Sequence, residues 1–123
     1  MKEIRLEFFL KTSPAVLFSR ISTSSGLAEW FADNVREEGK IFTFTWGDTE
    51  QKAIVLTKIT NESIRFRWLD TEPGNEFGFN IIKDELTGDV ALIVTDNIDD
   101  DDVEDTRILW SSQVAKLKQT IGS

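Results

Sequence analysis

The sequence contains no cysteine, no histidine and no tyrosine. The absence of cysteine excludes disulfides and thiolate metal sites. The absence of histidine removes the usual acid–base group at neutral pH, the commonest metal ligand and the base of a Ser-His triad. Catalysis, if the chain performs any, would depend on Asp, Glu, Lys, Arg, Ser or Thr side chains.

Positive charge is also scarce, because 14 Lys and Arg stand against 22 Asp and Glu, which gives a net charge of −8. The basic residues are scattered, whereas binding to nucleic acid or an anionic membrane requires them in clusters. The first residues lack the apolar segment of a signal peptide, and no apolar run approaches the roughly 20 residues of a membrane span. The sequence therefore predicts a cytoplasmic protein with no nucleic-acid partner and no membrane insertion.

What the chain does contain is an ordinary globular balance of 40% hydrophobic and 29% charged residues, with nine Phe and four Trp. A length of 123 residues suits one domain with one core. No linker, internal repeat or change of composition divides the chain. We therefore expect residues 1–123 to form a single domain.

The first third of the chain predicts one strand and two short helices. Residues 3–11 alternate between apolar and polar side chains, as in a strand with one covered face. Ser13 and Pro14 then suit the N-cap and the first position of a helix. A second short helix, capped by Ser24 or Ser25, is expected to carry three apolar residues: Leu27, Trp30 and Phe31.

After the helices, apolar residues recur at every second position, which predicts five short strands in an antiparallel meander. Turn residues separate them at 47–48, 61–62, 72–75 and 86–89. Residues 52–59 are apolar at both alternating sets of positions, which predicts a strand covered on both faces. The inward positions of the meander carry most of the aromatic side chains: Phe42, Phe44, Trp46, Phe66, Trp68, Phe77 and Phe79.

The C-terminal segment predicts a long amphipathic helix. Its apolar positions recur at spacings of three and four and fall in one narrow stripe: Val103, Thr106, Trp110, Val114, Leu117 and Ile121. Gly122 follows where a helix would end. Ile108 and Leu109 lie off the stripe, so they would either widen the buried side or meet a partner chain. The helix and the sheet can bury their apolar sides only against each other, which makes the fold class α+β.

Four segments carry a family resemblance, namely SPAVLFSRISTSSGLAEWFAD, GKIFTFTWGD, SIRFRW and ILWSSQVAKLKQTIG. In their order and spacing the chain resembles the START-like, or Bet v 1-like (SRPBCC), superfamily. The nearest likeness is to the branch related to the Aha-type activator of the heat-shock chaperone ATPase. The resemblance covers nearly the whole chain. It implies a helix-grip fold, in which a curved antiparallel sheet of six strands wraps a long C-terminal helix and two short helices separate strands one and two.

Two features depart from this family pattern. Many relatives carry a proline in the turn before the F-x-W strand, whereas this chain has none at residues 60–63. The chain is also near the short end of the superfamily, which predicts a cavity that is small or filled.

The superfamily includes carriers of apolar ligands, cyclases and hydrolases, and chaperone regulators, and the fold does not choose among them. We predict a non-enzymatic domain that binds a small apolar ligand between the sheet and the C-terminal helix, with no cofactor, catalytic residue or metal. Ten residues are expected to line this cavity: Trp30, Phe31, Phe44, Trp46, Phe66, Trp68, Phe77, Phe79, Trp110 and Val114.

Three alternatives stay open at this stage. Aromatic residues at strand spacing commonly form a solid core, and the chain would then be a protein-interaction or chaperone-regulatory module. A homodimer or another protein partner is also allowed. A cyclase-like or hydrolase-like enzyme would instead require a carboxyl group of raised pKa at the cavity wall.

The stretch DNIDDDDVEDTRILW concentrates acidic residues at positions 96, 99–102, 104 and 105. A calcium loop of the EF-hand type requires Gly at its sixth position and Glu at its twelfth, where this stretch has Asp101 and Arg107. We therefore interpret the stretch as a helix start, capped by Asp101 or Asp102, with more negative charge than capping requires. Weak, nonspecific binding of divalent ions stays open.

Overall fold

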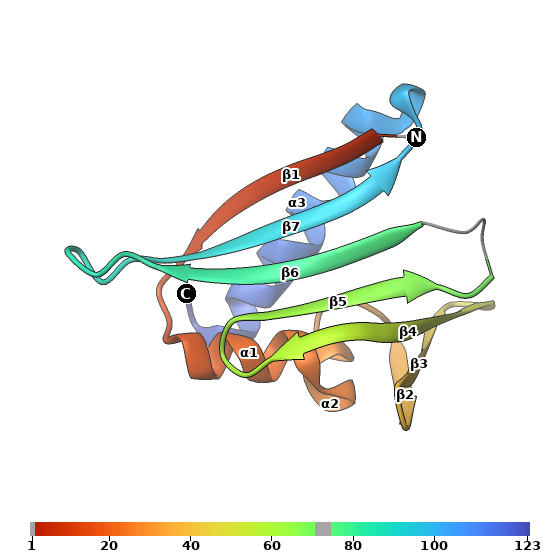
Figure 1. The fold of residues 1–123 in the computed structure, drawn as a ribbon, viewed down its shortest axis with the longest axis horizontal. Coiled ribbons are helices and arrows are strands. Elements are labelled where there is room, and N and C mark those ends of the chain that lie inside the picture. The colour runs from red at the N-terminus through yellow and green to blue at the C-terminus, as the bar shows by residue number, and fades with distance from the viewer. Residues whose placement is uncertain (1, 71–74) are drawn as a thin grey trace.

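The computed structural model describes residues 2–70 and 75–123, which form one curved antiparallel sheet with helices on one of its faces (Figure 1). The strands lie in the order β1-β7-β6-β5-β4-β3-β2. The strands are β1 (Lys2–Leu10), β2 (Asn34–Glu38), β3 (Ile41–Trp46), β4 (Thr49–Ile59), β5 (Ser63–Trp68), β6 (Glu76–Lys83) and β7 (Val90–Ile98). The helices are α1 (Pro14–Ser22), α2 (Ser24–Leu27), the short 3₁₀ helix η1 (Asp100–Asp102) and α3 (Val103–Ile121).

This arrangement confirms the predicted α+β helix-grip fold, with two short helices after the first strand and a long helix at the end. The prediction of six strands was wrong, because the sheet has seven. The additional strand is β2, in which Val35 is the one buried residue. An edge strand that buries so little apolar surface has no alternation of apolar and polar residues. The sequence therefore contains no signal for β2, although it pairs with β3 in the structure.

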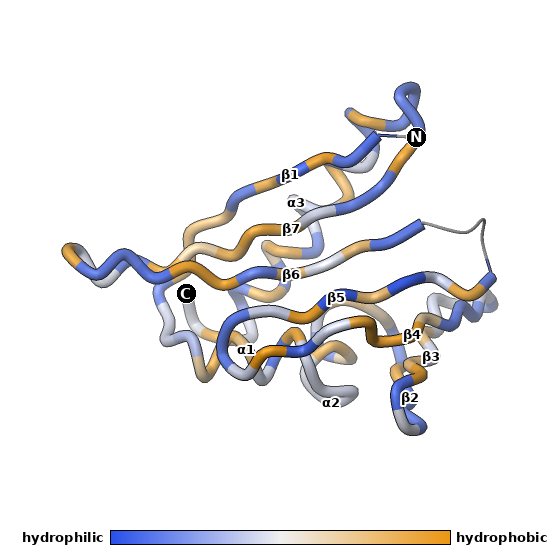
Figure 2. The backbone as a smooth tube through the Cα atoms, viewed as in Figure 1, coloured by the Kyte–Doolittle hydropathy of each residue, from blue (hydrophilic) through white to orange (hydrophobic). Residues whose placement is uncertain are grey.

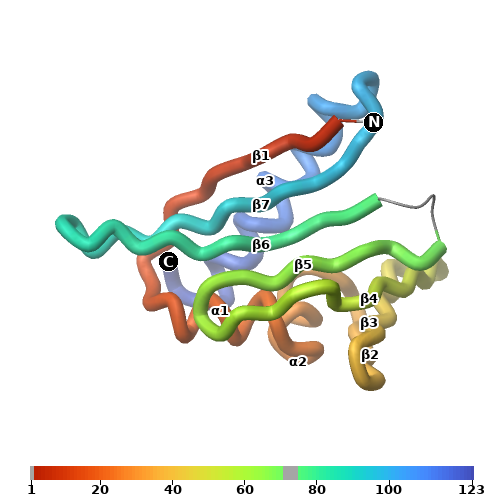
Figure 3. The backbone as a smooth tube through the Cα atoms, in the orientation of Figure 1, coloured from red at the N-terminus to blue at the C-terminus, as the bar shows by residue number. Residues whose placement is uncertain are grey.

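Strands from the two ends of the chain lie side by side in the sheet. Figure 3 shows β1, in red, next to β7, in blue, and their register pairs Leu6 with Val94. In β1, the inward side chains Ile4, Leu6 and Leu10 are buried, whereas Glu3, Arg5 and Glu7 between them are exposed. The predicted alternation is therefore confirmed, and it assigns one face of the sheet to the core and the other to solvent.

The prediction that residues 52–59 are covered on both faces was wrong. Ala53 is the one buried residue of β4, and Leu56 and Ile59 are exposed. A bulge interrupts the register with β5 between Val55 and Thr57. None of the described helices lies over the outer face of β4 (Figure 1), so the β-branched residues on that face reflect strand propensity rather than burial.

Helix α3 packs on the sheet through the stripe that the sequence predicted. Trp110, Val114 and Leu117 are buried, and Val103, Thr106 and Ile121 are partly buried. The helix ends at Gly122, whose φ of 82° is the left-handed conformation that glycine adopts without strain. Within the described residues, no helix combines the length and the apolar character needed to cross a membrane.

Local hydrogen bonds define the start of both short helices. The Ser13 hydroxyl accepts a hydrogen bond from the backbone N–H of Val16 at 3.2 Å, and Pro14 is the first residue of α1, as predicted. The cap of α2 is Thr23, not Ser24 or Ser25, and its hydroxyl accepts from the N–H of Gly26 at 3.0 Å. Trp30 and Phe31 lie beyond the end of α2.

Apolar residues concentrate in β7 and α1, whereas the β6–β7 connection, apart from its apolar tip, and the first turns of α3 are mainly hydrophilic (Figure 2). In the β6–β7 connection the Asp84 carboxylate accepts the backbone N–H groups of Leu86 and Thr87, which closes the predicted turn. The turn predicted at residues 72–75 lies almost wholly outside the described residues.

Gly26 marks the tightest approach between the two short helices. A methyl group at this position would lie 2.7 Å from the Arg20 Cα and closer still to the Ser19 carbonyl oxygen. Both are backbone atoms, so they cannot move aside without displacing α1. We expect Gly26→Ala to lower the free energy of unfolding by about 1–3 kcal/mol, measured by urea denaturation.

The matched control is Ser25→Ala, which adds no atom and changes an exposed residue of the same helix. Its unfolding midpoint should stay close to that of the wild type. Equal midpoints for both variants would contradict the close packing of α1 on α2.

Candidate functional site

The structure brings the ten predicted cavity residues together in one cluster on the inner face of the sheet. Eight of them are buried, with exposed fractions from 0% to 4%, and Trp46 and Trp68 are half-buried. Neighbouring rings lie 4.7 to 6.5 Å apart between centroids, in stacked and edge-on arrangements. Such distances are those of packed aromatic cores.

Packing fills the deep part of this cluster. The Phe77 ring stacks on Phe66 at 4.9 Å and on Trp68 at 4.7 Å, and the Phe44 ring meets Phe66 edge-on at 6.1 Å. Six of the ten residues therefore occupy the core away from the groove described next: Trp30, Phe44, Phe66, Phe77, Phe79 and Val114.

The remaining four residues line an open groove of about 380 Å³ beside α3, which we call the aromatic groove. They are Phe31, from the loop after α2, Trp46 and Trp68, at the ends of β3 and β5, and Trp110 of α3. Five further residues complete the lining: Gln51, Asp96, Thr106, Leu109 and Gln113. A space of this size is within the range of small-molecule sites, although it lies at the edge of the core and is open to solvent.

The Phe31 backbone holds the two sides of the aromatic groove together. Its carbonyl oxygen accepts one hydrogen bond from the Trp46 indole N–H at 2.8 Å and another from the Gln113 side-chain amide at 3.0 Å. The Phe31 ring stacks on Trp110 at 5.6 Å and meets Trp46 edge-on at 5.4 Å. One loop residue therefore links β3 and α3, so the width of the groove depends on it.

Asp96 brings a carboxylate to the inner face of the sheet. It continues the inward-facing series Leu92 and Val94 in β7, and it pairs across the sheet with Ile4 and Phe77. Both cross-strand neighbours are apolar, so the carboxylate is partly removed from water, and no ion pair of the described part of the chain involves it. Asp96 therefore puts a charged side chain at an inward position of β7, whereas the preceding inward positions of the strand are apolar.

Trp110 supplies the main compensation for this burial. Its indole N–H donates a hydrogen bond to the Asp96 carboxylate at 2.9 Å. Desolvation raises the pKa of Asp96, and this effect outweighs the opposite effects of the bonds from Trp110 and from the Asn97 backbone. The charged form of Asp96 is therefore less favourable in the folded protein than in the unfolded chain.

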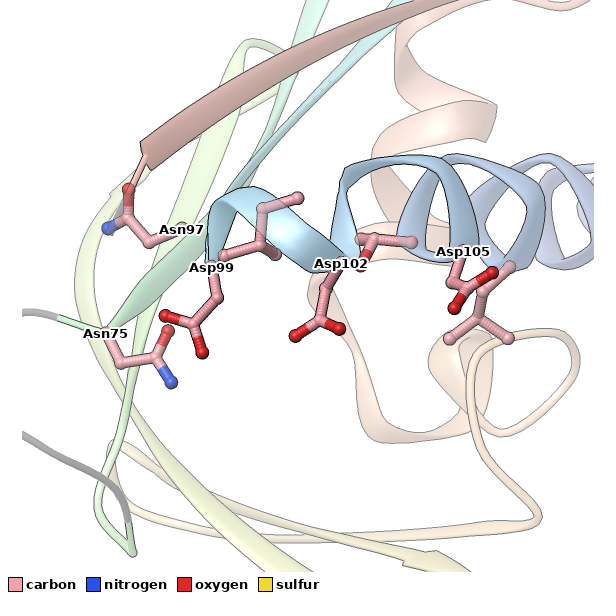
Figure 4. Close-up of a pocket in the computed structure, with 8 residues that line it drawn as sticks. Asn75, Asn97, Asp99, Asp102 and Asp105 are labelled. Carbon is pink, nitrogen blue, oxygen red and sulfur yellow. The ribbon is translucent and has the colours of Figure 1, made fainter.

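A second, polar hollow of about 340 Å³ adjoins the aromatic groove at the start of α3 (Figure 4). Thr106 and Leu109 line both spaces. The labelled side chains in Figure 4 are all carboxylates and amides, from Asn75, Asn97, Asp99, Asp102 and Asp105. Among the described residues, acidic side chains do not gather into a group that could hold a metal ion.

The acidic stretch begins α3, as predicted, but its side chains do not cap it. Asp102 is the N-cap residue of α3 and Asp99 that of η1, and neither side chain makes a capping hydrogen bond. Glu104 and Asp105 lie in the first turn of α3, where the helix dipole favours negative charge. The surplus acids at 99–101 therefore add mutual repulsion, and the N-cap residue Asp99 makes no capping bond that would offset it.

Several residues of the groove were missed by the sequence interpretation. Asp96 was assigned to the acidic stretch, although the period of two in β7 was a signal that it faces inward. Gln113 lies three residues after Trp110, on the same side of the helix. Leu109, which was expected to widen the buried side or meet a partner, is 57% exposed and lines the groove.

The raised pKa of Asp96 predicts a pH-dependent stability difference. Between its ordinary and its raised pKa, the folded state binds more protons than the unfolded state, so this group lowers stability as pH rises. We expect Asp96→Asn, whose amide oxygen can still accept from Trp110, to melt at an equal or higher temperature than the wild type at pH 7. The difference should shrink below about pH 4, where the native carboxyl is protonated. A variant less stable than the wild type at pH 7 would contradict the assigned cost of burial.

The missing capping bonds predict that the surplus acids are dispensable for folding. The double variant Asp99→Asn, Asp100→Asn should melt at the same temperature as the wild type or higher, and added salt should stabilise it less. Ser13→Ala is the control, because it removes a real capping bond and should cost about 1 kcal/mol. A loss in the double variant as large as that in the control would show that these carboxylates stabilise the helix start.

Comparison with known proteins agrees with this architecture. The family model for a START-like superfamily domain matches residues 1–123. No curated protein matches the sequence. A protein of Bacteroides fragilis, solved by NMR in solution, is 41% identical, with a TM-score of 0.70, over 97% of this chain and 90% of its own.

Two further solved structures share the fold at lower identity. The Aha1 dimer from Colwellia psychrerythraea is 18% identical, with a TM-score of 0.83, over 98% of this chain and 96% of its own. DynU16, a protein of the dynemicin biosynthetic locus, is 16% identical, with a TM-score of 0.82, over 98% of this chain and 47% of its own. On the match of the family model to its whole length, the chain belongs to the START-like superfamily.

Proposed function

We propose that the protein binds a small, mainly apolar ligand in the aromatic groove and does not transform it. The observation that carries this proposal is an open space of about 380 Å³ whose lining includes four aromatic residues. An apolar molecule in this space would remove ring surface of Trp46 and Trp68 from water, which favours binding by about 25 cal/mol per Å² buried. A cytoplasmic location remains part of the proposal.

The proposed site involves four of the ten residues that were predicted to line a cavity. Phe66 and Phe77 stack at 4.9 Å where the deep part of a cavity would lie, so a ligand would rest against the edge of the aromatic cluster. This geometry favours short or flat ligands over ligands that require full enclosure. The four groove residues then act as ligand contacts, and the other six support them.

A binding role fits the chemistry of the groove better than a catalytic one. Asp96 is the one ionisable side chain among the described residues of its lining, and its carboxylate is held by Trp110. Two other carboxylates accept hydrogen bonds from backbone N–H groups. Asp33 accepts from the N–H of Gly47 at 2.8 Å, and Asp84 accepts from the N–H of Leu86 in its turn. A second acid, base or nucleophile beside Asp96 would be needed for general acid–base chemistry.

The filled core supports a second candidate, a protein-interaction or chaperone-regulatory module. In this reading the half-buried rings Trp46 and Trp68 would meet a side chain of a partner protein instead of a free ligand. A homodimer also stays a prediction, and the similar Aha1 structure is that of a dimer. The two candidates differ in whether a small apolar molecule binds the isolated protein.

Filling the groove should abolish small-molecule binding. Thr106 lines the groove on α3, so Thr106→Phe would place a ring in the space. We expect the neutral probe N-phenyl-1-naphthylamine to fluoresce with the wild type, and this signal to fall at least about tenfold in the variant, because the site is occupied. The measurement is a fluorescence titration at constant protein concentration.

The control is Ser111→Phe, which places the same ring on an exposed position of α3. This variant should bind the probe as the wild type does. Equal binding by Thr106→Phe and the wild type would reject the groove as the site. Absence of probe binding to the wild type would reject the carrier function and leave the interaction module.

A further inference from the structure

The aromatic groove joins ring surface and negative charge in one site. Its rings come from Phe31, Trp46, Trp68 and Trp110, and the carboxylate of Asp96 lies among them. The Trp110 N–H binds one oxygen of this carboxylate, Oδ2, at 2.9 Å. The indole N–H groups of Trp46 and Trp110 are both used within the protein, so neither is left to bind an anionic head group.

Among residues 2–70 and 75–123, no positive charge lies in the lining around this carboxylate. No ion pair of the described residues involves Asp96, and the described linings of the groove and the adjoining hollow include no Lys or Arg. The hollow instead adds the carboxylates of Asp99, Asp102 and Asp105. A ligand that extends from the rings toward the start of α3 would therefore meet further carboxylates and no described cationic side chain.

We propose that the preferred ligand is an alkylammonium ion, with its apolar chain against the rings and its cationic nitrogen beside Asp96. This inference rests on the proposed function and names its ligand class. Ammonium groups are attracted both by the faces of aromatic rings and by carboxylates. A cation here would offset the cost of burying Asp96, whose pKa burial raises. An anionic amphiphile of the same length would be repelled.

The test compares three ligands that share one chain and differ in charge: decylammonium, decanol and decanoate, each below its micelle concentration. Titration calorimetry at pH 7 should give a dissociation constant for decylammonium about tenfold lower than for decanol, as expected for a cation held by rings and a carboxylate. Decanoate should bind more weakly than decanol.

Two variants separate Asp96 from the general negative charge of the protein. Asp96→Asn should remove most of the preference for decylammonium over decanol while decanol binding persists. Asp100→Asn removes the same charge from a neighbouring exposed position outside both linings, and the preference should remain.

The outcomes distinguish this inference from the function on which it rests. If decanol binds as tightly as decylammonium, or if Asp96→Asn keeps the full preference, the ammonium assignment is overturned and apolar binding stands. If Asp100→Asn loses as much preference as Asp96→Asn, the selectivity comes from net charge and the assignment is also overturned. If none of the three ligands binds, and the neutral naphthylamine probe fails too, both proposals are rejected.

Discussion

The contact of the Trp110 ring with Phe31 and Phe79 is the interaction on which the rest of this structure depends. The ring stacks on Phe31 at 5.6 Å, meets Phe79 edge-on at 5.7 Å and donates its N–H to Asp96. It thereby joins the long helix to the loop after α2 and to the neighbouring strands β6 and β7. The sheet has one covered face, so the helix position set by this residue determines how much of that face is buried and where the groove remains.

The core and the candidate site are parts of one aromatic cluster that differ in depth. Phe44 and Phe66 are fully buried inside the cluster, whereas Trp46 and Trp68 are half-buried at the strand ends. A gradient of this kind allows the interior to supply stability while the margin stays accessible to a ligand. The same gradient explains why a packed core and a binding site do not exclude each other in so short a chain.

The sequence patterns predicted the elements that bury a regular apolar face and failed where burial is irregular. The stripe of α3 and the alternation of β1 follow directly from periodicity. Strand β2 has one buried side chain and therefore no period, and the exposed apolar residues of β4 imitate a covered strand. The aromatic residues of the meander follow the period of two, but which of them fill the core and which line the groove depends on ring volumes and angles that periodicity does not contain. Asp96 was overlooked because the acidic run at 99–102 follows it closely in sequence, whereas its cross-strand neighbours are Ile4 and Phe77.

The pairing of β1 with β7 has a consequence for how the chain folds. Residues 2–10 find their hydrogen-bond partners only in residues 90–98, so nearly the whole chain must be present before this part of the sheet can form. Contacts of such long sequence separation carry a high loop-closure cost and slow folding. During synthesis, we therefore expect the pairing of β1 with β7 to form only after the seventh strand has left the ribosome. The groove requires both Phe31 and Trp110, so we expect it to be among the last parts of the structure to form.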